Sequence, residues 1–295
     1  MKILVTGRAG QLALSLAERA SYFPGIELVF VGRPELDLED PTSLERAIAG
    51  ARPDVVLNAA AYTAVDQAES DIDTARKVNA EAAGYLGRAA RAAGARMIQI
   101  STDYVFDGEA AEPYSEDAAI APINIYGRTK AEGEAAVREA LEEHIIVRTS
   151  WVFSPFGKNF VRTMLSVAQT RETLTVVDDQ IGCPSSALDL ADGILSMIAR
   201  WQRDPRHGLG RTYHLVGGGS CSWADFARQI FATSAAHGGP TAQVTGVRSA
   251  QWPTPARRPR NSRLDTSRFI ETFGYRPPHW RDATAQVVAR LLAQN

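Results

Sequence analysis

Tyr126 and Lys130 lie four residues apart in the stretch INIYGRTKAEGE, in a chain with only four lysines against 28 arginines. On a helix, residues i and i+4 face the same way, so both side chains would reach one point. A phenol is a poor acid–base group at neutral pH, but a nearby ammonium favours the phenolate and eases proton donation to a developing alkoxide. A compact ammonium also binds ribose hydroxyls differently from a broad guanidinium. The pair predicts a catalytic tyrosine and lysine.

A hydroxyl and a carboxylate follow an apolar run in the stretch QISTDYVFDG. Thr102 and Asp103 would lie at the carboxyl end of a central strand, where ligands bind in open α/β sheets. The hydroxyl of Thr102 could hold a substrate carbonyl oxygen. The alternative is a polar strand end closed by a local hydroxyl turn.

The stretch VTGRAGQLA at residues 5–13 predicts a dinucleotide-binding turn between a strand and a helix. Gly7 permits the tight turn, and Gly10 lets the backbone approach a pyrophosphate at the helix N-terminus. Ala13 is the small residue where that helix packs on the sheet. Glycine by itself is weak evidence, because any tight turn of this kind favours it.

The second strand ends with Gly32 and Arg33 rather than with the acidic residue typical of a site for NAD. A guanidinium suits a 2′-phosphate, and Arg8 could assist it, so NADPH is favoured and NADH stays possible. Asp37 could line the adenine pocket. The alternative is that Arg33 is a solvated loop residue.

The third apolar run, PDVVLNAA, ends with Asn58, Ala59 and Ala60. These small or polar residues occupy the segment whose backbone is expected to lie against the cofactor. A packed strand end would explain them equally well.

Five apolar runs alternate with helical patterns over residues 1–150 and would position these side chains. Strands that are apolar throughout and alternate with helices indicate a parallel sheet covered on both faces. The fold class predicted is therefore α/β, with a doubly wound, Rossmann-like sheet. The strands expected are KILVTG, IELVFVG, PDVVLNAA, ARMIQIS and HIIVRTS, and the long Ala-rich stretch 73–94 is expected to be one helix.

After residue 150 the alternation stops, which predicts a smaller, mixed α/β second domain for the substrate. The segment WPTPARRPRNSR in this half has several arginines, which suit phosphate. Helices are expected at 158–170, 187–201, 223–235 and 281–293, and short strands at 173–177 and 211–216.

Composition excludes several classes of protein. A net charge of -2, with no long basic run, argues against nucleic-acid or membrane partners. No apolar run reaches membrane-spanning length, and two distant cysteines make no disulfide framework, so a cytoplasmic location is expected. The five histidines are scattered, so we expect no metal site.

Together, the glycine loop, NAAAYTAVDQAE, STDYVFDG, YGRTKAEGE, RTSWVF, DDQIGCPS and PTPARRPRNSRLD resemble the extended short-chain dehydrogenase/reductase superfamily. Within it the chain resembles the dTDP-4-dehydrorhamnose reductase family, from residue 1 to about residue 280. Tyr-x-x-x-Lys marks the superfamily, whereas STDYVFDG and RTSWV are more specific. The resemblance implies NADPH-dependent reduction of the C4 ketone of dTDP-4-dehydro-L-rhamnose to dTDP-L-rhamnose, for cell-surface polysaccharide.

The resemblance also implies roles for single residues. Tyr126 is the proton donor, Lys130 tunes it and holds the nicotinamide ribose, and Thr102 completes the triad. The substrate is expected to contact Thr102, Asp103, Tyr104 and Trp151. The residues expected at the cofactor, from the motifs and the resemblance, are Gly7, Arg8, Gly10, Gln11, Leu12, Arg33, Asp37, Leu38, Asn58, Ala59, Ala60, Ala61, Tyr62, Thr63, Tyr126 and Lys130.

The helix after CPSS is expected to return to the first domain. The cofactor domain would then comprise 1–150 and about 187–204, and the substrate domain about 151–186 and 205–295. Some members of the family are metal-bridged dimers that use acidic side chains where this chain has Ser15 and Leu188. We therefore expect no bridging metal, and a monomer or a weak homodimer.

Three other functions stay open. A nucleotide-sugar 4,6-dehydratase would need a glutamate at the position of Tyr104, which makes that activity the least favoured. A reductase of a related dTDP-4-keto-6-deoxysugar would present the same groups to its ketone. A non-catalytic, NADP-binding regulatory subunit could also keep these motifs.

Overall fold

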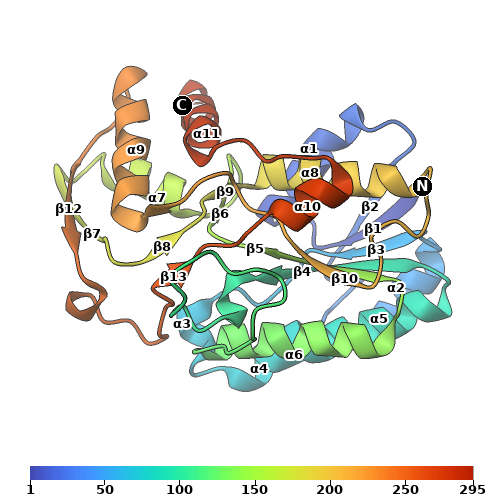
Figure 1. Ribbon diagram of the computed structural model, residues 1–295. Helices are drawn as coiled ribbons and strands as arrows, with labels where there is room; N and C mark the ends of the chain where they lie inside the picture. The colour runs from blue at the N-terminus through green and yellow to red at the C-terminus, as the bar shows by residue number, and fades with distance from the viewer. Residues whose placement is uncertain (295) are drawn as a thin grey trace.

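A six-stranded parallel sheet forms the centre of the computed structural model, which describes residues 1–294 (Figure 1). Its strand order is β10-β5-β4-β3-β1-β2. From β1 the chain first adds β2 on one side and then adds β3 and the later strands on the other side, so the order of the strands reverses between β1 and β3. Ligands bind at such a switch point in open α/β sheets. The strands are β1 (Lys2–Thr6), β2 (Glu27–Val31), β3 (Val55–Asn58), β4 (Arg96–Thr102), β5 (His144–Thr149) and β10 (Arg211–His214).

Helices cover both faces of this sheet, as Figure 1 shows. One face packs against α1 (Gln11–Arg19), α8 (Ala187–Trp201) and α10 (Ser267–Phe273). The other packs against α2 (Pro41–Ala51), α5 (Ala82–Ala92) and α6 (Ile125–Ala140). This confirms the predicted doubly wound, Rossmann-like α/β fold.

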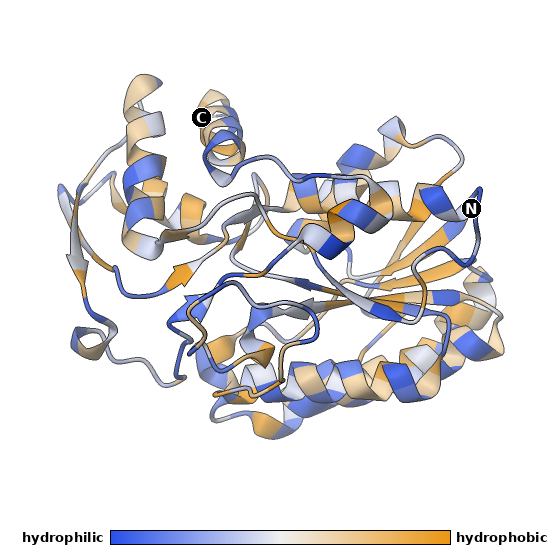
Figure 2. Cartoon of the chain, in the orientation of Figure 1, coloured by the Kyte–Doolittle hydropathy of each residue, from blue (hydrophilic) through white to orange (hydrophobic). Residues whose placement is uncertain are grey.

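The strands are buried because their side chains are apolar on both faces. Figure 2 shows the apolar colouring concentrated on the central strands, and Ile3, Leu4 and Val5 of β1 are fully buried. A strand enclosed in this way needs no polar face, which explains why alternation is missing from its sequence.

A smaller part of the molecule follows β5 and contains its own core, centred on α7 (Phe160–Val167), α9 (Trp223–Ala236) and α11 (Trp280–Ala293). It lies to the left in Figure 1. Its short strands are β6 (Val152–Phe153), β7 (Thr173–Val177), β8 (Ile181–Gly182), β9 (Ser185–Ser186), β11 (Cys221–Ser222), β12 (Gln243–Val247) and β13 (Asn261–Ser262).

One strand lies elsewhere than predicted. β10 was expected in the smaller domain, but it pairs in parallel with β5 at the edge of the large sheet. This pairing satisfies backbone groups of β5 that would otherwise be unpaired. α10 also packs on the core of the large sheet. The rest of the predicted division into domains stays a prediction.

The long helix expected at 73–94 is interrupted. It consists of α4 (Ile72–Arg76), a π-helical turn at Lys77–Glu81, and α5. The π turn contains Asn79, whose side chain accepts a hydrogen bond from the backbone N–H of Tyr62 at 2.9 Å. A π turn therefore lies where the helix supports the segment after β3, in line with the frequent occurrence of such turns near functional sites.

The remaining short elements are α3 (Val65–Ala68) and 3₁₀ turns at Ala20–Tyr22, Asp103–Val105 and Ser249–Gln251. Among residues 1–294, no helix combines the length and the apolar character that crossing a membrane requires.

Candidate active site

A cavity of about 690 Å³ lies at the carboxyl ends of β1, β3, β4 and β5, beside the start of α6. It therefore includes the switch point between β1 and β3. Fifteen of the predicted site residues line it: Gly7, Arg8, Gly10, Gln11, Leu12, Ala59, Ala60, Ala61, Thr63, Thr102, Asp103, Tyr104, Tyr126, Lys130 and Trp151.

The glycine loop fits a dinucleotide phosphate. Gly7 has a φ of +89°, a conformation that residues with side chains rarely adopt. Gly10 precedes α1 without a capping side chain, and a Cβ added to it would meet no atom within 4 Å. The first turn of α1 holds no acidic residue. Its free backbone N–H groups and its dipole can therefore receive an anion.

Tyr126 and Lys130 lie on one face of α6, as their spacing predicts, and both line the cavity. The helix starts where the side chain of Asn124 accepts a hydrogen bond from the N–H of Gly127 at 2.8 Å. Lys130 Nζ donates to the carbonyl oxygen of Ile100 on β4 at 2.7 Å. This bond holds the ammonium beside the strand that carries Thr102.

Burial decides the proton affinity of both side chains. It raises the pKa of Tyr126 to about 12, against a smaller lowering effect of Thr102. It also lowers the pKa of Lys130 to about 8, which Glu134 partly offsets. Desolvation therefore decides the pKa of Tyr126 in the free protein, and the lowering expected from the Lys130 ammonium is not found there. Tyr126 therefore keeps its proton at neutral pH, as a proton donor must.

α6 approaches the strand end closely because it lacks a side chain at one position. A Cβ added to Gly127 would lie 2.0 Å from the carbonyl oxygen of Tyr104. The rings of Tyr104 and Tyr126 meet edge to face, with centroids 5.8 Å apart. The glycine in the YGRTK motif thus allows Tyr126 to reach the end of β4.

Thr102 and Asp103 form the polar end of β4. Thr102 Oγ1 donates to Asp103 Oδ1 at 2.9 Å and accepts from the N–H of Tyr104 at 3.2 Å. The local hydroxyl turn considered from the sequence is therefore present, and the same two residues also line the cavity. Burial raises the pKa of Asp103 to about 7, and its Oδ2 has no hydrogen-bond partner among residues 1–294.

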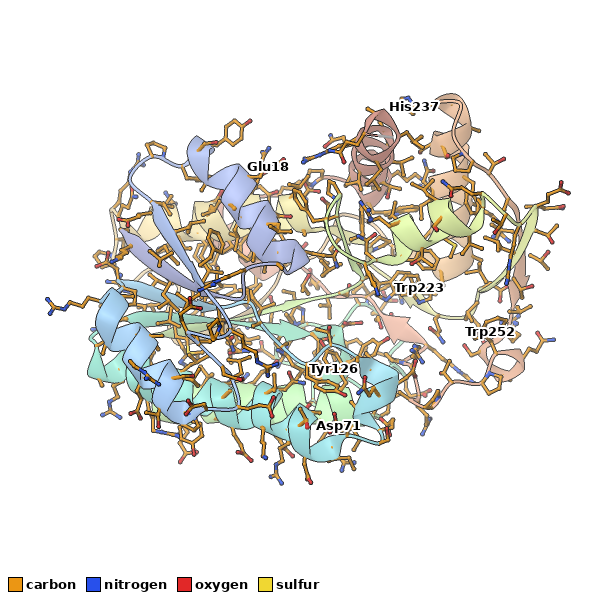
Figure 3. All side chains as sticks on the ribbon, turned by 180° about the vertical axis from the view of Figure 1, so that it is seen from behind. Glu18, Asp71, Tyr126, Trp223, His237 and Trp252 are labelled. Atoms are coloured by element: carbon orange, nitrogen blue, oxygen red, sulfur yellow. The ribbon has the colours of Figure 1, made fainter. Side chains whose placement is uncertain are left out.

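Trp151 forms a wall of the cavity from the smaller part of the molecule. Its φ is +47°, and its ring stacks on that of Trp223, with centroids 3.6 Å apart and an interplanar angle of 10°. A Cβ at Gly182 would lie 2.4 Å from the Trp151 ring, so glycine is required there. Figure 3 labels Trp223 and Tyr126 in the two parts of the molecule that meet at the cavity.

Five predicted cofactor residues do not line the cavity. Arg33 is exposed and pairs with Asp37 and Glu39 at 3.0 and 2.8 Å. Asn58 is buried and donates to Gln99 at 2.9 Å, while the hydroxyl of Tyr62 donates to Asp71 at 3.1 Å. The five residues are Arg33, Asp37, Leu38, Asn58 and Tyr62. Their roles at the cofactor stay predictions.

Several cavity residues were missed from the sequence, and two of them, Trp223 and Lys158, have large or charged side chains. Trp223 begins α9, and Lys158 precedes the Asn159 cap of α7. Neither belongs to a motif, and no local spacing connects Trp223 to Trp151. The scarcity of lysine was the only sequence signal that could have drawn attention to Lys158.

Ser15 and Leu188, which the resemblance places where some relatives have acidic dimer ligands, carry no carboxylate. Ser15 is buried and donates to the carbonyl oxygen of Gln11 at 2.8 Å. No cluster of three or more His, Cys, Asp or Glu side chains that could hold a metal occurs among residues 1–294. The predicted absence of a metal site and the predicted oligomeric state stay predictions.

A family model described as "RmlD substrate binding domain" matches residues 1–293. Among curated proteins, a dTDP-4-dehydrorhamnose reductase from Sinorhizobium fredii is 42% identical over 294 residues, covering 100% of this chain and 99% of the relative. One from Burkholderia thailandensis is also 42% identical and covers 100% of both chains.

Solved structures agree with these matches. A dTDP-4-dehydrorhamnose reductase from Clostridium acetobutylicum superposes with a TM-score of 0.90 at 36% identity, covering 99% of both chains. One from Bacillus anthracis, in complex with NADP, gives 0.88 at 34% identity and covers 98% and 99%. The chain therefore belongs to the dTDP-4-dehydrorhamnose reductase family, in the extended short-chain dehydrogenase/reductase superfamily, and is an oxidoreductase that uses a nicotinamide cofactor.

Proposed function

We propose that this enzyme reduces the C4 ketone of dTDP-4-dehydro-L-rhamnose to dTDP-L-rhamnose with NADPH, in the cytoplasm. The observation that carries the proposal is the convergence of Thr102, Tyr126, Lys130 and Trp151 on the cavity that the glycine loop borders. The relatives that bear this reductase's name support the choice of substrate.

Residues of the larger part would hold the cofactor. The backbone of Gly10, Gln11 and Leu12 would bind its diphosphate, and Lys130 its nicotinamide ribose. When bound, the cofactor supplies the hydride. Arg8 and Arg33, rather than an acidic residue at the end of β2, favour a 2′-phosphate. The proposed preference for NADPH predicts a lower KM for NADPH than for NADH.

The chain's own groups manage the proton and the carbonyl oxygen. Thr102 would hold the ketone oxygen by a hydrogen bond, and Tyr126 would give its proton to the alkoxide that forms there. A phenol is a stronger acid than an alcohol, so this transfer remains favourable even with the pKa of Tyr126 at about 12. Trp151 and Trp223 would shield the sugar from water, and Asp103 and Tyr104 would contact it.

The variant Tyr126→Phe tests the proton donor. We expect kcat to fall by at least about 100-fold, because a positioned acid contributes on that order. The Kd for NADPH, measured by nucleotide fluorescence, should change little, since the ring is kept. Turnover near that of the wild type would sink the assignment.

Product identification separates the proposal from the alternatives. The protein is incubated with dTDP-4-dehydro-L-rhamnose and NADPH, and the sugar is identified by NMR. A product with rhamnose stereochemistry supports the proposal, whereas a different C4 epimer favours the related reductase. A protein that binds NADPH but never oxidises it would be the regulatory subunit.

A further inference from the structure

A buried ion pair lies behind the reacting side chains and has no role in the mechanism above. Glu134 on α6 is fully buried, and Arg148 on β5 is 1% exposed. Arg148 donates through Nε to Glu134 Oε1 at 2.8 Å and through Nη2 to Oε2 at 2.7 Å. A buried pair of this kind usually stabilises a fold no better than apolar residues would, so its position suggests another role.

The pair connects three of the elements around the site, α6, β4 and β5. Glu134 lies one turn after Lys130 on α6, and its Oε1 also accepts from Ser101 Oγ on β4 at 2.6 Å. Ser101 stands between Ile100, whose carbonyl oxygen holds Lys130 Nζ, and Thr102. Any shift of α6 along β4 would therefore break the Glu134 contacts and the Lys130 contact together.

Glu134 also supplies the negative charge near the ammonium. Burial disfavours the charged form of Lys130 and lowers its pKa. The negative charge of Glu134 raises the same pKa and partly offsets this effect. Burial raises the pKa of Glu134, but the hydrogen bonds and the charge of Arg148 outweigh this effect and lower the pKa below its usual value. Glu134 is therefore ionised.

Other titratable groups around this network do not replace that charge. Arg138 on α6 donates to Glu134 Oε2 at 2.9 Å and adds positive charge. His214 on β10 lies 3.4 Å from Arg148 Nη1, and burial lowers its pKa to about 3, so it is neutral. The Glu116 carboxylate accepts a hydrogen bond from the backbone N–H of His214, and burial raises the pKa of this carboxyl. Burial also raises the pKa of Asp103, to about 7.

We propose that Glu134 is a positioning residue that, with Arg148, fixes α6 on β4 and β5 and keeps the ammonium of Lys130 charged in its desolvated setting. The inference rests on the proposed function only for its effect on turnover. The relation between the two charges is a property of the free protein and is measured there.

The four lysines of the chain make this relation measurable by NMR. The protein is labelled with ¹⁵N-lysine, the Nζ signals are followed against pH, and the Lys130 signal is assigned with Lys130→Arg. In Glu134→Gln we expect the Lys130 midpoint to fall by about one pH unit, because an opposite charge has been removed. Glu134→Asp keeps the charge and should keep the midpoint near that of the wild type. Glu139→Gln, an exposed carboxylate on the same helix, is the matched control.

An unchanged Lys130 midpoint in Glu134→Gln overturns the proposal. If that variant fails to fold by circular dichroism, Glu134→Gln/Arg148→Met removes the unpaired cation as well. Its midpoint should lie below that of Arg148→Met alone, in which Glu134 is still present, and equal midpoints in these two variants overturn the idea.

Turnover gives the second arm. The alkaline limb of the kcat/KM profile should move to lower pH in Glu134→Gln but not in Glu139→Gln, whereas a merely structural defect would lower kcat/KM at every pH. If the wild type itself shows no turnover, the proposed function fails, and the NMR titration still decides the role of Glu134.

Discussion

At the scale of single residues, the site combines groups whose burial or backbone conformation costs free energy. Asp103 is 3% exposed, lacks a partner for Oδ2 among residues 1–294, and has its pKa raised to about 7. Trp151 has a backbone conformation that favours glycine. Such costs persist only where the surroundings fix them, and they are common at functional sites.

Asp103→Asn tests this cost through the pH dependence of stability. Between about pH 4 and pH 7 the folded protein binds more protons at Asp103 than the unfolded chain, so stability falls as pH rises through this window. Removing the ionisable group should raise the free energy of unfolding at pH 8 by up to about 4 kcal/mol, with a smaller gain near pH 4. Urea unfolding at the two pH values measures it.

The same change at an exposed carboxylate is the control. Asp117 pairs with Arg268, and this hydrogen bond lowers the pKa of its carboxyl, so Asp117→Asn should give no gain at pH 8. A variant Asp103→Asn no more stable than the wild type at pH 8 would contradict the argument.

At the scale of elements, α6 is the part that brings the site together. Its first half carries Tyr126 and Lys130, and its second half carries Glu134. The helix packs closely against the π turn, because a Cβ added to Gly133 would lie 2.1 Å from the carbonyl oxygen of Asn79. Asn79 in turn holds Tyr62 in the segment after β3. Glycine at 133 thus sets the distance between α6 and the helix beside it.

Gly133→Ala should destabilise the protein by about 2 kcal/mol or more, because backbone rather than a flexible side chain must move. Chemical denaturation measures the loss. Gly50→Ala is the matched control, since Gly50 also lies inside a helix, α2, and an added Cβ there meets no atom within 4 Å. It should stabilise the protein by up to about 1 kcal/mol. Equal effects of the two changes would rule out the close packing of α6 as the cause.

At the scale of the whole molecule, polar contacts join the two parts around the cavity. Ser154 Oγ donates to Gln11 Oε1 at 2.8 Å, next to the glycine loop. On the far side of α1, Arg290 of α11 forms two bonds to Glu18, at 2.7 and 2.8 Å. Arg258 reaches across to Asp66 on α3 with bonds of 2.7 and 3.0 Å, and it also interacts with Tyr104. The substrate site therefore depends on how these parts are held.

Arg258→Ala should raise the KM for the sugar nucleotide by about tenfold, because a partly buried, charge-assisted contact beside Tyr104 is lost. The KM for NADPH should change much less, since the glycine loop keeps its own contact to Ser154. Steady-state kinetics with each substrate varied in turn measures both. Arg290→Ala removes an ion pair between the parts away from Tyr104 and should leave both constants nearly unchanged. A similar rise in both KM values for Arg258→Ala would argue for a general loosening instead.

The sequence by itself determined the features that depend on neighbours in the chain. Apolar runs alternating with helical patterns specify the parallel sheet, and the residues that follow each run lie at its carboxyl end because the strands are parallel. The spacing of Tyr126 and Lys130 was sufficient to place them on one face of a helix. Most of the predicted cavity residues belong to such local motifs.

Only the tertiary structure decided features that depend on packing between distant segments. It stacked Trp223 on Trp151, placed β10 beside β5, and paired Arg148 with Glu134. Local periodicity records which face of an element is buried, but not which other element covers that face. That choice is made when side chains, backbone hydrogen bonds and charges are satisfied together in one compact structure.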